Sequence, residues 1–179
     1  TDYYGHVSSF NEDGFQLDHV SGEPPFYVNQ TGRTYVAWCW KAGGGSNTFN
    51  VDGTGYATAS AAGITDGSIA LTGASVNREA GFSMVTYAGT GSAGTVGHGL
   101  GKKPTFWLMK NTSDTSGWFT YYTFTDGSLD YMYLDTTAAK ANSNASVPTT
   151  TTVGATSSLS TSGDTWIVYA WTCLLYTSP

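Results

Sequence analysis

The side chains that could do chemistry in this chain are few and widely separated. The three histidines, His6, His19 and His98, have neither an HExxH nor a CxxC pattern beside them, and such patterns supply the ligand spacing of a zinc site. No Gly-x-Ser-x-Gly nucleophile elbow occurs. A glycosidase needs two carboxylates that face one sugar, whereas the acidic residues here are scattered, mainly in turns. The sequence therefore predicts no catalytic residues and no enzyme activity.

Residues 97–103 superficially resemble a phosphate-binding loop. Such a loop needs a glycine ahead of a Gly-Lys-Ser/Thr end, and a helix that follows it. Val96 occupies the position where that first glycine is needed before Gly101, and Lys103 stands where Ser or Thr is needed. We therefore interpret the run as a glycine-rich connection between strands, and His98 within it as a turn residue whose hydrogen bonds are satisfied.

A calcium site is the one metal hypothesis that the sequence leaves open. Residues 11–14 supply Asn, Glu, Asp and Gly in a row, but the spacing of an EF-hand would place Ser9 at its first position and Val20 at its last. The other acidic candidates lie in Asp-Gly turns, which explain them without a metal. We therefore predict no cofactor and no metal ligands, with Ca²⁺ conceivable but unsupported.

The aromatic residues, 15% of the chain, are the remaining functional signal. On a strand with one exposed face they could stack on sugar rings, while nearby Asn, Asp and Thr side chains form hydrogen bonds. Alternating aromatics also fill cores and support contacts between subunits, so this second interpretation stays open. The candidate residues for glycan or interface contact are Trp107, Trp118, Tyr121, Tyr122, Tyr131 and Tyr133.

The elements that must position these residues are predicted to be β-strands. Charged residues are only 11% of the chain and 23 residues are Gly, a composition that favours strands and turns over helices. Tight reversals are predicted by Asp-Gly pairs at 13–14, 52–53, 66–67 and 126–127. The clearest expected strands are 35–41, 82–87, 106–110, 118–124, 131–135 and 166–172, and weaker ones are 7–10, 14–18, 55–59, 68–72 and 151–157. Only residues 136–145 could form a turn or two of helix. The fold class predicted is all-β, an antiparallel β-sandwich of jelly-roll type.

An internal repeat suggests that the chain holds parts of two related modules. Residues 31–40 match residues 162–171 at an offset of 131, and each copy is a polar turn followed by a strand with aromatics on both faces. We expect residues 1–43 to be the C-terminal strands of a first module and residues 80–172 to form a second β-sandwich module. Residues 44–79, rich in Gly, Ser and Thr, are predicted to be a structured connector with a hairpin.

The composition also argues against several partners. The formal net charge is −6, and Lys102 and Lys103 are the only adjoining pair among seven Lys and Arg residues, so clustered cations for nucleic acid are missing. No apolar run approaches about 18 residues, and no membrane insertion is expected. The chain starts with neither Met nor a signal peptide, and we expect it to begin within a longer protein.

The C-terminal residues 173–179 resemble a translated sequencing adaptor, and we expect them to be a non-native tail. With Cys173 set aside, Cys39 is the remaining cysteine, flanked by Trp38 and Trp40. A lone cysteine in an aromatic strand is most often a small buried hydrophobe, which we predict here. Neither a disulfide nor a metal site is inferred from it.

Four ordered segments resemble a module of structural and tail proteins from marine, cyanophage-like bacteriophages. The segments are 35–43 (YVAWCWKAG), 80–87 (AGFSMVTY), 95–104 (TVGHGLGKKP) and 106–113 (FWLMKNTS). Two departures are Thr112, where that family usually has a basic residue, and the loss of its acidic, aromatic closing segment. The resemblance covers nearly all of residues 7–172 and implies a virion location, often beside laminin-G or concanavalin-like modules. It implies no catalytic activity and no binding residues, so none is carried over.

These observations lead to three functional hypotheses. The first is a non-enzymatic virion structural or tail-appendage module that acts in assembly or display, with other virion subunits as partners, as a homo-oligomer. The alternative is a carbohydrate-binding adhesin that contacts a host-surface glycan through aromatics in a concave site. The third is an endo-glycosidase, which requires paired carboxylates in a groove.

Overall fold

The computed structural model describes residues 5–12, 14–18, 32–123 and 128–172. The chain divides into two compact units, Thr1–Cys39 and Trp40–Pro179. Strands dominate the described residues, which contain one short 3-10 turn, η1 (Ser157–Leu159), and no α-helix. No helix in this part of the chain is long and apolar enough to cross a membrane. The all-β prediction is therefore confirmed, while the predicted module boundaries stay a prediction.

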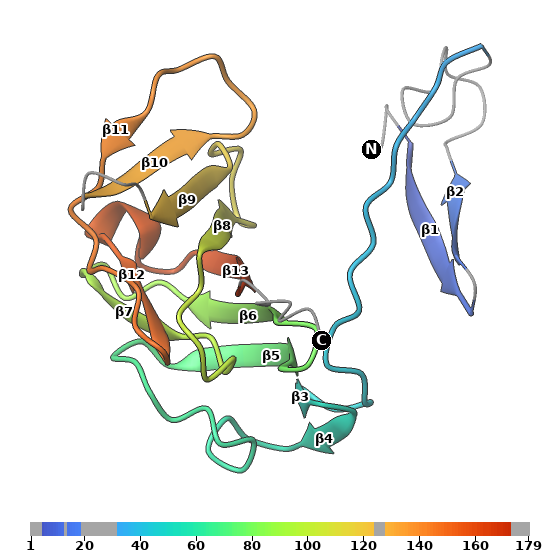
Figure 1. The fold of residues 1–179 in the computed structure, drawn as a ribbon, viewed down its shortest axis with the longest axis horizontal. Coiled ribbons are helices and arrows are strands. Elements are labelled where there is room, and N and C mark those ends of the chain that lie inside the picture. The colour runs from blue at the N-terminus through green and yellow to red at the C-terminus, as the bar shows by residue number, and fades with distance from the viewer. Residues whose placement is uncertain (1–4, 13, 19–31, 124–127, 173–179) are drawn as a thin grey trace, which may run out of the picture. The chain divides into compact units, whose positions relative to one another are not determined.

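The C-terminal unit is built on a nine-stranded sheet of order β11-β10-β9-β8-β13-β6-β5-β3-β4 (Figure 1). Its strands are β3 (Phe49–Val51), β4 (Thr54–Tyr56), β5 (Leu71–Asn77), β6 (Phe82–Ala88), β8 (Phe106–Asn111), β9 (Phe119–Thr123), β10 (Leu129–Tyr133), β11 (Ala141–Asn142) and β13 (Thr165–Trp171). A second sheet pairs β7 (Gly94–Gly97) with β12 (Thr152–Ala155). One neighbouring pair, β3 and β5, is parallel, a departure from the antiparallel pairing that the turns predict.

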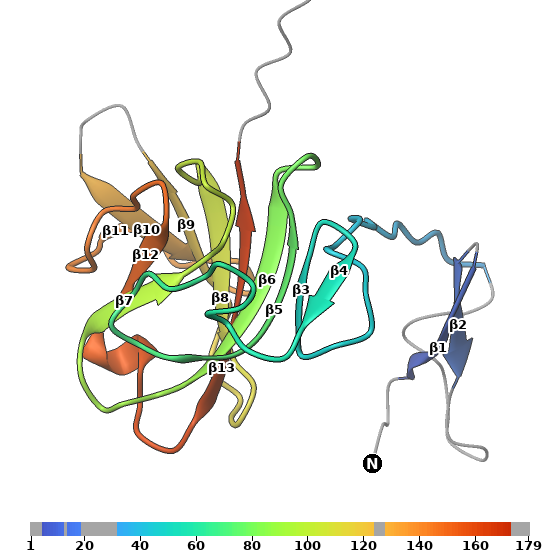
Figure 2. The same cartoon turned by 90° about the horizontal axis from the view of Figure 1, so that it is seen from below.

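The two sheets form a β-sandwich whose core lies between them (Figure 2). Val96 of β7 and Val153 of β12 are fully buried in one cluster with side chains from the large sheet. In that sheet Val168 of β13 lies between Val85 of β6 and Met109 of β8, and all are buried. Each such side chain contributes roughly 1.5–3 kcal/mol on leaving water. The long-range pairing of these strands therefore fixes the frame that holds the pocket described below.

The opposite, outer face of the large sheet is apolar as well but only half buried. Alternation along β13 directs Trp166 and Val168 into the core and turns Tyr169 and Trp171 outward. The aromatics expected on both faces of this strand are thus present, but one face alone is fully covered.

Several predicted strands of this unit are confirmed. β6, β8 and β13 match their expected ranges to within a residue at each end, while β10 begins and ends earlier than expected. Asp52 and Gly53 turn the β3–β4 hairpin with φ of 50° and 87°, and such positive values suit the Asp-Gly pair. Residues 136–145 form no helix and contain β11 instead. The tail 173–179 and the reversal at 126–127 lie outside the described residues.

The N-terminal unit contains one hairpin and an extended segment. β1 (His6–Asn11) pairs antiparallel with β2 (Gly14–Asp18), and both strands were expected from the sequence. The register shifts between Val7 and Ser9. Asp13, in the reversal between the strands, lies outside the described residues. Residues 33–39 then continue without regular secondary structure.

The prediction of a strand at residues 35–41 is wrong, because these residues pair with no neighbouring strand. Val36 and Trp38 are 71% and 76% exposed, and Cys39 is exposed too, which contradicts its predicted burial. The matching copy, β13, lies between β6 and β8 in the middle of the large sheet. A strand with apolar side chains on both faces needs such neighbours. The described part of the N-terminal unit supplies only the β1–β2 hairpin.

Candidate ligand-binding pocket

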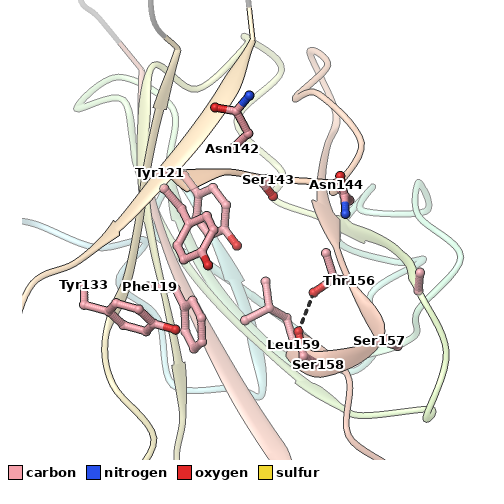
Figure 3. A pocket seen from close by; sticks show the side chains of 12 residues that line it. Phe119, Tyr121, Tyr133, Asn142, Ser143, Asn144, Thr156, Ser157, Ser158 and Leu159 are labelled. Carbon is pink, nitrogen blue, oxygen red and sulfur yellow. Dashed lines mark hydrogen bonds between the residues drawn. The ribbon is translucent and has the colours of Figure 1, made fainter. Parts of the chain in front are cut away.

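A pocket of about 530 Å³ opens where β9, β10 and β11 of the large sheet face the segment from β12 to η1 (Figure 3). Its volume lies within the range of about 300–1,000 Å³ that is usual for small-molecule sites. The lining residues are Ala93, Phe119, Tyr121, Tyr131, Tyr133, Asn142, Ser143, Asn144, Thr156, Ser157, Ser158 and Leu159. Figure 3 shows Phe119, Tyr121 and Tyr133 on one side of the hollow and Thr156 and Leu159 on the other.

The aromatic wall follows from the register of β9 and β10. Tyr131 pairs with Tyr121, and Tyr133 pairs with Phe119, so all four rings lie on the inner face of the sheet. Ring centroids are 4.9 Å apart for Phe119 and Tyr133 and 5.9 Å apart for Tyr121 and Tyr131. Tyr131 and Tyr133 meet edge to face at 5.8 Å. These contacts hold the rings in place before any ligand arrives.

The polar wall comes from two loops that are far apart in the sequence. Asn142 ends β11, and Ser143 and Asn144 follow it; the Ser143 N–H donates to the Leu129 carbonyl at 2.7 Å and ties this loop to β10. The side-chain amides of Asn142 and Asn144 form no hydrogen bond with another described residue. The Asn144 amide therefore has donors and an acceptor available for a ligand, whereas Asn142 is in register with Asp130 and its amide points away from the rings (Figure 3).

The second polar loop lies between β12 and η1. The hydroxyls of Thr156 and Ser158 are hydrogen-bonded at 2.8 Å, and Ser157 and Ser158 are exposed. Leu159, which closes η1, is buried and forms an apolar part of the floor. The pocket thus combines aromatic rings, one aliphatic group and a rim of hydroxyls and amides.

The pocket has no charge among its lining side chains. Burial raises the pKa of the Tyr121 phenol, against an opposing hydrogen bond with Ser143, and also raises that of Tyr133. Both phenols therefore remain neutral at physiological pH. Asp130, between Leu129 and Tyr131 on β10, is buried and pairs with Lys140 at 2.7 Å. Strand alternation turns this carboxylate away from the face that carries the rings.

The structure brings some of the predicted contact residues together and separates others. Tyr121, Tyr131 and Tyr133 line the pocket. Trp107 is fully buried behind Tyr121, with the two rings stacked at 5.2 Å, so the expectation of an open face is wrong for Trp107. Trp118 and Tyr122 lie outside the pocket on the outer face, where Trp118 stacks on Tyr169 at 6.1 Å and Tyr122 contacts the Met132 sulfur at 3.1 Å.

Sequence reasoning missed most of the polar half of the site. Phe119 could have been predicted from the sequence, because it lies two residues before Tyr121 on one strand and so shares its face. Asn142 and Asn144 carried no signal, since they lie in a stretch read as a doubtful helix, and Ser157 and Ser158 resemble any other serine of the chain. They line one pocket only because the segment after β11 and the segment after β12 come to the same hollow in the folded chain, which no local pattern reveals.

The glycine-rich run at 97–103 connects β7 to the following segment, as predicted, and no helix follows it. His98 is fully buried there; its Nδ1 accepts from the Leu100 N–H at 3.2 Å and its Nε2 lies 3.4 Å from the Thr149 carbonyl. Burial lowers the pKa of His98 to about 4, against smaller opposing effects of that carbonyl and of Asp66. His98 is therefore a neutral structural residue. Within the described residues, no group of three or more His, Cys, Asp or Glu could hold a metal ion.

Comparison with known proteins identifies a family but no characterised relative. A family model described as a domain of unknown function, DUF7483, matches residues 1–174. No curated protein and no solved structure matches the chain. The family description assigns no activity, so a functional assignment depends on the geometry of the chain itself.

Proposed function

The chain belongs to the DUF7483 family of domains of unknown function, and we propose that it is a non-enzymatic module that binds a saccharide in the pocket between β9–β11 and the β12–η1 segment. One observation carries this proposal: an aromatic wall and a rim of amides and hydroxyls converge on one concave site. This is the arrangement that the adhesin hypothesis requires.

A sugar ring matches this combination of surfaces. Its C–H groups form an apolar face that packs against aromatic rings, and its hydroxyls both donate and accept hydrogen bonds. Tyr131 and Tyr133 are half buried, so part of each ring remains open to a ligand. Asn144 and Ser157 at the rim are exposed and can reach hydroxyl groups without a large conformational change.

The lining favours binding over hydrolysis. Glycoside hydrolysis uses two carboxylic groups, separated by roughly 5–9.5 Å, one on each side of the scissile bond. The pocket is lined by no Asp or Glu, and the nearby Asp130 is paired with Lys140. A bound sugar would therefore be held without an acid to protonate its glycosidic oxygen.

The proposed location is the surface of a bacteriophage particle, where the module would display this pocket to a host glycan. Support comes from the four segments that resemble phage structural and tail proteins, which include most of the first repeat copy and the strands β6 and β8. A charge-poor sandwich with few titratable groups suits display outside a cell, because its stability should vary little with pH above about pH 6.5.

A glycan-array screen of the full chain, followed by titration calorimetry, tests the proposal. Replacing Tyr131 by Ala should weaken the binding of the best glycan by about tenfold or more, because the stacking surface is lost. Asn144→Ala, at an exposed position, should weaken it without affecting folding. The matched control is Tyr122→Ala, on the outer face of the neighbouring strand, which should leave affinity unchanged. Absence of glycan binding, or an equal loss for Tyr122→Ala, contradicts the proposal.

A second candidate function, contact between subunits in the virion, is favoured by the outer face of the large sheet. There Trp171 lies with its ring centroid 5.0 Å from Phe82, 5.2 Å from Phe106 and 5.2 Å from Trp40. The run continues through Tyr169. A half-buried apolar face of this kind is typical of surfaces that pack against another subunit.

We propose that the partner on this face is a second copy of the chain. Light scattering over a range of protein concentrations should detect a dimer or higher oligomer. Trp171→Asp should abolish association, because it places a charge in the apolar contact, while Tyr133→Asp in the pocket should not. A chain that stays monomeric at all concentrations, or that associates equally well with Trp171→Asp, rules out this candidate.

A further inference from the structure

We infer that the pocket selects an uncharged sugar, a neutral pyranoside, over acidic and amino sugars. This rests on the proposed function and adds the ligand class to it. The inference comes from the charge and the hydrogen-bonding character of the lining, which consists only of aromatic, aliphatic, hydroxyl and amide side chains.

The first argument is the absence of a cation in the lining. A uronic or sialic acid carries a carboxylate, which proteins usually bind through Arg or Lys, often with paired hydrogen bonds. Lys110 lies on β8 and Lys140 lies just before β11, but Lys110 donates to the backbone carbonyls of Asn111 and Asp114, and Lys140 pairs with Asp130. Neither Lys110 nor Lys140 lines the pocket. A carboxylate in the pocket would lose water without gaining an ionic partner.

The second argument is the absence of an anion in the lining. An amino sugar carries an ammonium group that requires a carboxylate or several carbonyls. Asp130 is committed to Lys140, and the Asp135 carboxylate accepts a hydrogen bond from the Trp118 N–H at 3.2 Å. The phenols also stay neutral, since burial raises the pKa of Tyr121 and Tyr133. The pocket thus offers no fixed charge of either sign.

The third argument is a positive match to neutral hydroxyls. A sugar hydroxyl donates one hydrogen bond and accepts others. Asn144 presents an amide with both functions and Ser157 an exposed hydroxyl with both functions, while the Ser143 hydroxyl accepts from the Ala145 N–H and the Ser158 hydroxyl is shared with Thr156. An amide and a hydroxyl of this kind can pair with a sugar hydroxyl as donor or as acceptor without a charge.

The fourth argument is the field of the whole chain. The formal net charge of −6 repels anionic glycans as they approach, although salt at physiological concentration screens this repulsion beyond about 8 Å. The long-range field therefore acts in the same direction as the lining and adds to the discrimination against acidic sugars.

The test uses matched sugars that differ in one group. Two-dimensional ¹H–¹⁵N NMR titrations of the full chain would compare the methyl glycosides of glucose, galactose and mannose with those of glucuronic and galacturonic acid and of glucosamine. At least one neutral glycoside should bind, and its charged counterpart should bind about tenfold more weakly or worse. Equal or tighter binding of the charged counterpart overturns the inference while the proposed function stands. Failure of every sugar to bind contradicts both.

A gain-of-function variant sharpens the test. Asn144→Lys adds a cation to the rim, and it should shift the ratio of acidic to neutral affinity toward the acidic sugar by about tenfold. The matched control is Thr115→Lys, which changes the net charge equally at an exposed position outside the pocket. A ratio that is unchanged in Asn144→Lys, or that shifts as much in Thr115→Lys, contradicts a selection made by the lining.

Discussion

The two faces of the large sheet are both rich in aromatic rings, but the pocket for a small ligand lies on the inner face. On the inner face Tyr121, Tyr131 and Tyr133 meet a rim of amides and hydroxyls around a hollow. The outer face carries Tyr122 of β9 and Trp118, the residue just before β9. Tyr122 contacts Met132 and Trp118 stacks on Tyr169. Aromatic content therefore does not identify the site. Concavity and convergent polar groups do.

The difference arises from alternation and from what covers each face. Successive residues of β9 point to opposite sides, so neighbours in the sequence have different surroundings. The inner side is covered by β7, β12 and η1, which bury Trp107 and leave a gap over Tyr131 and Tyr133. The described part of the C-terminal unit has no further sheet for the outer side, because its second sheet, β7–β12, lies on the inner side.

The largest expected contrast between the faces is in stability. Trp107→Ala, at a fully buried inner position, should cost about 3–5 kcal/mol, because a cavity opens beside Tyr121. Trp171→Ala on the outer face should cost only about 1–2 kcal/mol, because Trp171 is only partly buried. Urea denaturation followed by circular dichroism measures both. Equal losses would show that the outer face is covered as fully as the inner one.

The second-largest effect on stability is expected from acid, which should act mainly through His98 in the inner layer. His98 has a pKa of about 4 in the folded chain against 6.5 when exposed, so the unfolded chain binds more protons between these values. The free energy of unfolding should hold above about pH 6.5 and fall by roughly 3 kcal/mol as the pH drops toward 4. Urea titrations at pH 7 and pH 4 measure the loss.

The control for the acid effect is His98→Gln. This variant should be less stable than the parent chain at pH 7, because the Leu100 and Thr149 backbone groups lose their partner. Its free energy of unfolding should change less between pH 7 and pH 4. An unaltered pH dependence in His98→Gln would assign the acid sensitivity to other groups.

The smallest contrast is expected at two adjacent polar positions of β8. Asn111 is buried; it donates to the Asp164 carboxylate at 2.8 Å and accepts from the Ser113 N–H at 2.8 Å. Asn111→Ala should cost about 1–3 kcal/mol, because the Asp164 carboxylate and the Ser113 N–H each lose a partner in a partly buried contact. Lys110→Ala, at a half-exposed outer position, should cost about 0.5 kcal/mol. Thermal denaturation of the two variants would detect the difference, and a reversed order would contradict the inner and outer assignment.

Local sequence patterns were sufficient to predict several strands and one hairpin of the C-terminal unit. Apolar runs between turn residues located β6, β8 and β13, and the Asp52-Gly53 pair located the β3–β4 hairpin. These features depend on neighbours in the sequence, and a pattern of a few residues contains the information. The glycine-rich β7 was missed, because its residues resemble a loop and form a strand only by pairing with β12.

Long-range relations explain the other failures. Residues 34–40 and 165–171 have similar sequences but different structures, since β13 has β6 and β8 as neighbours and the first copy has no ladder. The candidate site was half predicted for the same reason. Strand alternation could suggest Tyr121, Tyr131 and Tyr133, but the amides and hydroxyls that make the hollow polar arrive from segments that meet only in the folded chain.

The most direct test of the account is a crystal structure of the full chain soaked with the neutral glycoside that binds best. The account predicts that the sugar ring packs on Tyr131 and Tyr133 and that its hydroxyls hydrogen-bond Asn144 and the serines of the rim. A sugar bound instead over Trp171 on the outer face, with the pocket empty, would contradict it.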